Sequence, residues 1–113
     1  SVAAITGYVE TPVGDEIALE EAVQSVGPVT VCIDAGQSSF GSYGGGVYDE
    51  PNCETYYSNH AVTVVGFGTE GGKDYWLVKN SWGEGWGEAG YIKMSRNNKN
   101  QCAIATYACY PTL

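Results

Sequence analysis

Basic side chains are scarce in this 113-residue chain, which has five Lys and Arg residues against thirteen Asp and Glu residues. The formal net charge is therefore -8 at pH 7, and such an acidic surface repels the phosphates of nucleic acids. Long apolar runs are absent too, because no stretch approaches the roughly 18 residues that a membrane-spanning helix requires. We therefore expect neither a nucleic-acid partner nor a membrane partner.

Metal-ligating and cofactor-binding patterns are equally sparse. The chain has one His, and its four Cys residues form no CxxC pair, so the usual zinc-binding spacings are missing. Residues 66–71 match GxGxxG, but the strand-like run KDYWLVKN follows where a dinucleotide site needs a helix. We interpret this match as a hairpin turn and expect no metal and no cofactor.

The residues that are abundant favour a folded β protein of one domain. Three Trp, nine Tyr and two Phe supply core-forming rings, and 43% of the chain is hydrophobic, which argues against disorder. Gly accounts for 16 residues, a composition typical of turns and unfavourable in helix interiors. The chain begins at Ser1 without Met, and we expect a processed product or a piece of a longer chain, with a recombinant product as the alternative.

The apolar spacing predicts one helix followed by strands and turns. Residues 15–26 carry apolar side chains at helical spacing, with Asp15 as the N-cap and Gly27-Pro28 as the stop; the apolar stripe is Leu19, Ala22, Val23 and Val26. Runs rich in Val, Ile, Tyr and Trp predict strands at 29–34, 61–67, 74–79, 90–95 and 105–109. The expected fold class is α+β, a small, mainly antiparallel sheet or barrel with one flanking helix.

The four Cys residues allow three fully paired connectivities, and their number does not choose among them. Cys53 and Cys102 lie in polar, turn-rich segments and are the better disulfide candidates. Cys32 and Cys109 lie among apolar, small or aromatic residues, and we interpret them as buried free thiols. One disulfide indicates an oxidising route such as secretion or the endomembrane system.

The single His and one Asn are candidates for a catalytic pair. His60 begins an apolar predicted strand, so its ring can combine a rigid backbone with access to solvent, as a general base requires. Asn80 ends another predicted strand and is followed by Trp82 in a glycine-rich loop. If the two strands are antiparallel neighbours, the Asn80 carbonyl can accept one imidazole N–H while a Trp excludes water. A structural His and a turn-capping Asn are the alternative interpretation.

No residue of the chain is a convincing nucleophile for this pair. Ser81 lacks the GxSxG surroundings of a nucleophile elbow. Cys32 and Cys109 lie neither at a predicted helix N-terminus nor beside a clear cation, so nothing in the pattern activates their thiols. The sequence therefore predicts a base and its orienting residue without the attacking group.

Several motifs resemble the C-terminal half of the papain-like cysteine proteases, and most of all the cathepsin L group. The similar segments cover almost the whole chain: Ser1-Val2-Ala3, Thr6-Gly7, Gly27-Pro28-Val29, Ile33-Asp34-Ala35-Gly36, Gly46-Val47-Tyr48, Asn59-His60-Ala61-Val62, YWLVKNSWG at 75–83, WGEAGY at 86–91, and Tyr110-Pro111-Thr112-Leu113. The YWLVKNSWG run with an upstream His is the most specific of them.

The resemblance implies a role for each matching residue. His60 would be the catalytic imidazole, Asn80 would orient it, and Trp82 would shield their hydrogen bond and line the leaving-group side of the cleft. Cys53 and Cys102 would form the disulfide of this half of the protease. The positions that build the pocket for the second substrate residue upstream of the cut correspond to Cys32, Ser58, Asn59, Ala61 and Tyr107. Tyr107 departs from the usual small residue, so we expect a shorter pocket or one that offers a hydroxyl.

The resemblance also shows what the chain lacks. In the family the nucleophilic Cys and the oxyanion-hole Gln belong to an N-terminal helical domain, and this sequence contains neither segment. Residues 1–113 would thus be the β-rich C-terminal domain, inactive alone, with that domain as partner, in the same precursor or as a second chain, and peptides as substrates. We expect an acidic, lysosomal or extracellular location. A silicatein-like protein with a Ser nucleophile, or a non-catalytic fragment, is the alternative.

Overall fold

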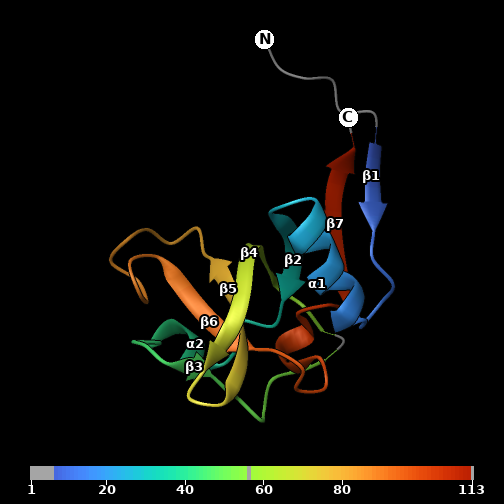
Figure 1. The fold of residues 1–113 in the computed structure, drawn as a ribbon. Helices are drawn as coiled ribbons and strands as arrows, with labels where there is room; N and C mark the ends of the chain where they lie inside the picture. The colour runs from blue at the N-terminus through green and yellow to red at the C-terminus, as the bar shows by residue number, and fades with distance from the viewer. Residues whose placement is uncertain (1–6, 56, 113) are drawn as a thin grey trace.

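Seven strands form one open sheet in the computed structural model, which describes residues 7–55 and 57–112 (Figure 1). The strands are β1 (Gly7–Glu10), β2 (Val29–Ile33), β3 (Val47–Tyr48), β4 (His60–Glu70), β5 (Lys73–Lys79), β6 (Tyr91–Ser95) and β7 (Tyr107–Thr112). Their spatial order is β1-β7-β2-β4-β5-β6-β3, and only β3 pairs in parallel with its neighbour. Residues 1–6 and 113, which carry part of the resemblance, lie outside the described residues.

The predicted fold class, a mainly antiparallel sheet with one main helix, is confirmed. The sheet does not close into a barrel within the described residues, because β1 and β3 stand at opposite ends of the strand order. The GxGxxG match also behaves as expected: β4 continues to Glu70, residues 71 and 72 turn, and β5 follows without a helix. Gly71 and Gly72 both have positive φ, the backbone conformation that such a tight hairpin turn demands of its residues.

Helix α1 (Glu16–Ser25) begins where the sequence predicts it. The Asp15 carboxylate accepts a hydrogen bond of 3.0 Å from the Ala18 N–H, and it therefore satisfies one of the free N–H groups of the first turn. The helix ends at Ser25 with Val26 as its C-cap, and Gly27 follows with a φ of 115°, which strongly favours glycine. Val26 was expected in the apolar stripe but is 49% exposed, because the chain leaves the helix there.

The hydrophobic core is one cluster that joins the buried face of α1, the inward side chains of the strands and the rings of Phe40 and Tyr48. Strand β2 alternates strictly, so Val29, Val31 and Ile33 are buried while Thr30 is exposed and Cys32 half-buried. This alternation follows from the period of two in a strand and gives the sheet a second, outer face. The largest fully buried side chains include six from five different elements, and Ile104, which lies outside the helices and strands: Leu19, Ile33, Phe40, Trp76, Ile92, Met94 and Ile104.

Two short helical segments replace what the sequence predicts as strand and turn. Helix α2 (Ser38–Gly41) interrupts the Ser/Gly-rich stretch because the buried Phe40 anchors it to the core. A single 3-10 turn, η1 (Gln101–Ala103), leads into the last strand. The predicted strand 105–109 therefore begins later, at Tyr107.

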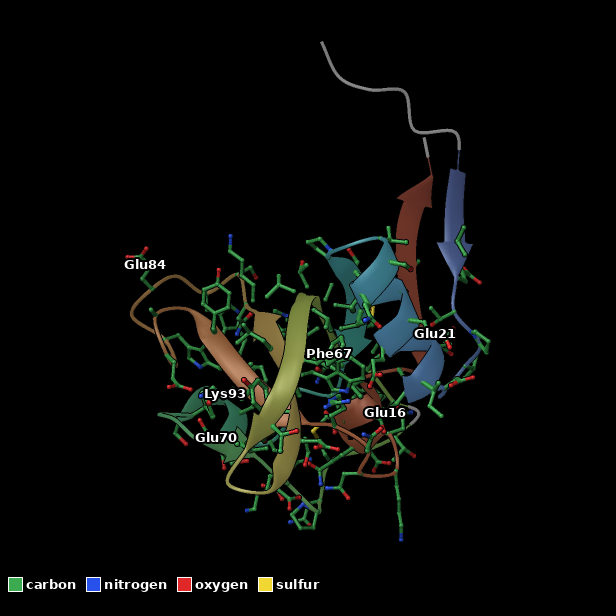
Figure 2. The ribbon with its side chains drawn as sticks, viewed as in Figure 1. Glu16, Glu21, Phe67, Glu70, Glu84 and Lys93 are labelled. Atoms are coloured by element: carbon green, nitrogen blue, oxygen red, sulfur yellow. A yellow bond between two sulfur atoms is a disulfide. The ribbon has the colours of Figure 1, made fainter. Side chains whose placement is uncertain are left out.

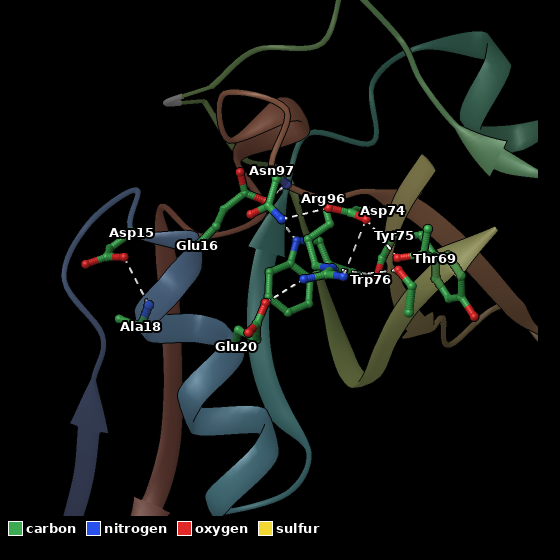
Figure 3. A network of polar contacts seen from close by, with 11 residues as sticks. Asp15, Glu16, Ala18, Glu20, Thr69, Asp74, Tyr75, Trp76, Arg96 and Asn97 are labelled. Atoms are coloured by element: carbon green, nitrogen blue, oxygen red, sulfur yellow. Dashed lines mark hydrogen bonds and ion pairs between the residues drawn. The ribbon is translucent and has the colours of Figure 1, made fainter. Parts of the chain in front are cut away.

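Polar contacts attach α1 to the hairpin β4–β5 and to the segment after β6 (Figure 3). The Glu16 carboxylate accepts hydrogen bonds from the Trp76 indole N–H at 2.9 Å and from the Asn97 and Asn100 backbone N–H groups at 2.9 and 3.1 Å. The Arg96 guanidinium, stacked between neighbouring aromatic rings, pairs with Glu20 on the same helix. These contacts join residues more than 50 positions apart in the chain.

The segment after β6 is also held by a disulfide between Cys53 and Cys102, which are 49 positions apart. The other two cysteines are free, as expected, but they are half-buried and not fully buried. They lie on the outer face of the sheet, where the strand alternation directs every second side chain away from the core.

Candidate active site

His60 and Asn80 meet at one end of the β4–β5 pair. Strand β4 begins at His60, and Asn80 follows directly after the end of β5. Because Thr63 pairs with Lys79, antiparallel continuation brings Asn80 level with Val62, diagonal to His60. The His60 Nε2 and the Asn80 Oδ1 are 2.7 Å apart, a hydrogen-bond distance.

The orientation of the Asn80 carboxamide is determined by a second hydrogen bond. The Ser81 backbone N–H donates to the same Asn80 Oδ1 at 2.7 Å, and a backbone N–H can only donate, so the atom it meets is the oxygen. His60 Nε2 must then be the donor, which leaves Nδ1 as the ring nitrogen able to accept a proton from a nucleophile. This arrangement gives the pair the tautomer that a general base needs.

An indole covers this pair. The Trp82 ring lies 4.9 Å from the His60 ring, centroid to centroid, and is inclined to it by 32°. Phe40 and Trp86 both contact Trp82, with ring centroids 5.4 Å away in each case, and Phe40 also lies near the His60 ring. Trp82 nevertheless remains 48% exposed.

Asn80 itself is nearly inaccessible, with 5% of its surface exposed. Its Nδ2 amide has no hydrogen-bond partner among the described residues. This burial keeps water from competing for the carboxamide oxygen, which strengthens its bond to His60.

The other residues predicted to bind substrate divide into two groups. Cys32, Ala61 and Tyr107 form one row across β4, β2 and β7, because Cys32 pairs with both of the others. Tyr107 is 59% exposed on this row. Ser58 and Asn59 precede β4, and Asn59 uses its side-chain oxygen to accept the Ala35 N–H at 2.9 Å.

Two pockets flank the row on the outer face of the sheet. One, of about 210 Å³, is lined by both free thiols and by Tyr107. The other, of about 310 Å³, is lined by Ala61, Lys79 and Ser81 among others and borders Asn80. Both pockets also involve Thr30, so they adjoin each other on this face.

Sequence reasoning missed several residues that shape the site. Phe40 and the Ser81 N–H carried no local signal, because their roles arise from contacts with residues far away in the chain or from backbone geometry. Tyr43 is buried beside Trp86, and its hydroxyl donates to Glu88 at 2.9 Å. Burial in the first place, and then the Glu88 carboxylate, raise the pKa of Tyr43 to about 12 against a partial opposing effect of the Lys93 N–H.

The described residues contain no thiol or hydroxyl hydrogen-bonded to His60, and no group of three or more His, Cys, Asp or Glu residues suited to a metal. None of the described helices is long and apolar enough to cross a membrane. Among the described residues, His60 and Asn80 therefore form a hydrogen-bonded pair that no thiol or hydroxyl joins.

A search of solved structures defines the class to which this fold belongs. The chain superposes with a TM-score of 0.94 and 54% identity on digestive procathepsin L2 from the larval midgut of Tenebrio molitor, covering 98% of this chain and 35% of that one. Bromelain from Ananas comosus, solved with the inhibitor E64, gives a TM-score of 0.88 and 47% identity, covering 96% of this chain and 51% of that one. The fold is thus papain-like.

Sequence comparison then gives the family. Residues 1–112 match the family described as "Papain family cysteine protease". Digestive cysteine proteinase 1 of Homarus americanus is 57% identical over 98% of this chain and 34% of its own length. Cathepsin L of Sarcophaga peregrina is 58% identical over 96% of this chain and 32% of its own length. The chain belongs to the papain family of cysteine proteases, and the resemblance to the cathepsin L group is confirmed.

The chain spans about a third of the length of the curated relatives it matches.

Proposed function

We propose that this chain is the C-terminal, β-rich domain of a cathepsin L-like cysteine endopeptidase that hydrolyses peptide bonds. The observation that carries the proposal is the His60–Asn80 hydrogen bond of 2.7 Å, whose direction the Ser81 N–H determines. A carboxamide that accepts from Nε2 leaves Nδ1 to deprotonate a nucleophile, which is the role of a base in acyl transfer.

The catalytic cycle uses His60 twice. A Cys thiolate attacks the substrate carbonyl while His60 is the imidazolium, and the imidazolium then gives its proton to the departing amine. The neutral imidazole next takes a proton from water, and the resulting hydroxide hydrolyses the acyl-thioester. Asn80 keeps the ring in one orientation through both steps, and Trp82 keeps solvent away from their hydrogen bond.

The nucleophile comes from an N-terminal helical domain, present in the same precursor or as a second chain. Two observations support this partner: the chain spans about a third of its relatives' length, and Trp82 lies half-exposed above the catalytic ring. A helix N-terminus in that domain would favour the thiolate form of the Cys. The 113-residue chain alone would then have no peptidase activity.

The substrates are peptides or proteins bound along the outer face next to His60. The row of Cys32, Ala61 and Tyr107, with Ser58 and Asn59 at the start of β4, would contact the second substrate residue upstream of the cut. Because Tyr107 is 59% exposed there, its ring limits the depth of that pocket and its hydroxyl can bind a polar side chain.

A lysosomal or extracellular location fits this protease. The Cys53–Cys102 disulfide requires an oxidising route, and thirteen acidic residues against five basic ones keep the surface charged down to mildly acidic pH.

The test is peptide hydrolysis by the complete protein with His60 replaced by Ala. We expect kcat/KM to fall by roughly 10²–10⁴-fold, the usual contribution of a general base. Asn98→Ala is the matched control, since among the described residues its side chain bonds Asp49 and Ser95, away from His60. Unchanged turnover in the His60 variant would refute the assignment. Activity that survives iodoacetamide would indicate a Ser nucleophile, as in silicateins.

A further inference from the structure

The proposed function uses neither of the two free thiols as a nucleophile. Cys32 and Cys109 are free and half-buried, and both line the same pocket of about 210 Å³ on the outer face of the sheet. Neither takes part in the disulfide, and neither has a partner in catalysis as proposed above. Their nucleophilic sulfur atoms therefore face a space into which a small molecule can enter.

The strand register separates the two sulfur atoms. Cys109 on β7 pairs with Thr30, whereas Cys32 on β2 pairs with Tyr107, so the two cysteines are diagonal neighbours. Diagonal Cα atoms in an antiparallel pair are about 7–8 Å apart. Because a disulfide rarely spans more than about 6.8 Å between Cα atoms, an internal bond between these cysteines is disfavoured.

The two thiols differ in their neighbours. Glu10, on β1, pairs directly with Cys109, and its exposed carboxylate lines the same pocket. Thr11, also in the lining, has a buried hydroxyl without a hydrogen-bond partner among the described residues. Cys32, in contrast, is flanked by Ala61 and Tyr107, which carry no charge at neutral pH. Only Cys109 combines a thiol with an anionic group directly across the strand pair.

We propose that this pocket is a thiol-modification site, in which Cys109 forms a mixed disulfide with a small cationic aminothiol whose ammonium group pairs with Glu10. The Glu10 carboxylate attracts the cation, and the pocket volume suits a group of side-chain size rather than a peptide. No unusual reactivity of the thiol is required, because the carboxylate raises the local concentration of the reagent.

The step is a thiol–disulfide exchange with a symmetrical aminothiol disulfide as the co-reactant. The Cys109 sulfur, having lost its proton to solvent, attacks one sulfur of that disulfide. The new bond joins Cys109 to one aminothiol, the old bond breaks, and the second aminothiol leaves as a thiolate that takes up a proton. Since Cys32 is too far to displace the adduct, only an external thiol reverses the reaction.

The adduct would obstruct substrate binding on the outer face of the sheet next to β4, a consequence that rests on the proposed function. Tyr107 and Cys32 lie on the same row as Ala61, the residue after His60. A group attached to Cys109 fills the pocket that Tyr107 and Cys32 line. Substrate binding is then weakened while the catalytic pair stays intact, so KM rises and kcat does not.

The experiment exposes the complete native protein to cystamine and maps the adduct by peptide mass spectrometry. Within residues 1–113 we expect one adduct, on Cys109, retained in Cys32→Ser and absent from Cys109→Ser; an adduct on the catalytic Cys of the N-terminal domain is mapped separately. Glu10→Gln should slow the reaction with cystamine roughly fourfold, the effect of one charge at about 5 Å in water, and leave the reaction with neutral 2-hydroxyethyl disulfide unchanged. Glu84→Gln, in the loop between β5 and β6, is the matched control (Figure 2).

Several results would overturn the proposal. These are an adduct on Cys32 instead of Cys109, an internal Cys32–Cys109 disulfide, reaction only in denaturant, or equal slowing by the Glu10 and Glu84 variants. Mapping does not depend on peptidase activity, so it separates this proposal from the failure of the proposed function. In active protein, modification of Cys109 that leaves KM unchanged would refute the proposed obstruction of substrate binding. Modification of the catalytic nucleophile is recognised separately, because it would lower kcat to the same extent in the Cys109→Ser variant and in the unsubstituted protein.

Discussion

Glu16 should be one of the most important surface-facing residues for stability. Its carboxylate accepts three hydrogen bonds, one from the indole N–H of the fully buried Trp76 and two from the backbone N–H groups of Asn97 and Asn100. Replacing Glu16 by Ala removes all three and leaves the indole N–H buried without a partner. In Figure 3 the neighbouring carboxylate of α1, Glu20, pairs with Arg96 instead.

The size of the effect follows from these contacts. A hydrogen bond to a charged group contributes about 1.5–3 kcal/mol, and a bond to an exposed backbone N–H contributes about 1 kcal/mol. Because the three bonds share one carboxylate, they are not additive, and we expect Glu16→Ala to lower the free energy of unfolding by about 3 kcal/mol. Glu21→Ala, on the same helix, removes an exposed carboxylate that makes no side-chain hydrogen bond and should change stability by less than about 0.5 kcal/mol.

Urea unfolding of the complete protein, followed by tryptophan fluorescence, measures both variants. A double-mutant cycle with Trp76→Phe isolates the indole bond and should give a coupling energy of about 1–2 kcal/mol between Glu16 and Trp76. Equal stabilities for the Glu16 and Glu21 variants, or a coupling energy near zero, would show that the carboxylate does not hold the hairpin to the helix.

Three further outcomes can be measured. Asn80→Ala should lower the kcat/KM of the complete protease by about 10- to 100-fold, as expected for a lost orienting bond of 1–3 kcal/mol, and an unchanged pH–rate profile and rate would contradict it. Replacing Cys53 and Cys102 by Ser should cost about 4 kcal/mol of stability, the chain-entropy value for a loop of this length, measured in guanidinium. The Tyr43 pKa is raised to about 12 in the folded protein. The contribution of this shift to the free energy of unfolding is therefore complete below the unfolded pKa of about 10 and disappears as pH rises through 12. Tyr43→Phe should therefore remove that alkaline loss of stability, which unfolding curves at stepwise pH would detect.

The contact between His60 and Asn80 could be anticipated because its signals are local. His60 opens a strand and Asn80 closes one, and any antiparallel pairing of two consecutive strands brings such ends together. The same holds for α1, whose cap and stop residues are adjacent to it in the chain. For these features, residues adjacent in the chain were enough to predict the structure.

The contacts that support the pair could not be anticipated in this way. Phe40 contacts the Trp82 ring from α2, a short helix that the Ser/Gly-rich composition does not predict. Strand β3 has two residues and is defined by their pairing with β6. Glu16 and Trp76 are 60 positions apart, and neither residue type signals the other. Such contacts depend on the packing of the whole sheet, which residue spacing does not encode.

The exposed Trp82 indole beside His60 is also an intrinsic fluorescence probe. Of the three tryptophans, Trp76 is fully buried and Trp86 half-buried, so Trp82 is the one that an aqueous quencher reaches most readily. A polypeptide that covers Trp82 would remove its indole from water and shift its emission to shorter wavelength. Assembly with a companion domain can thus be followed in real time by intrinsic fluorescence, without attaching a dye.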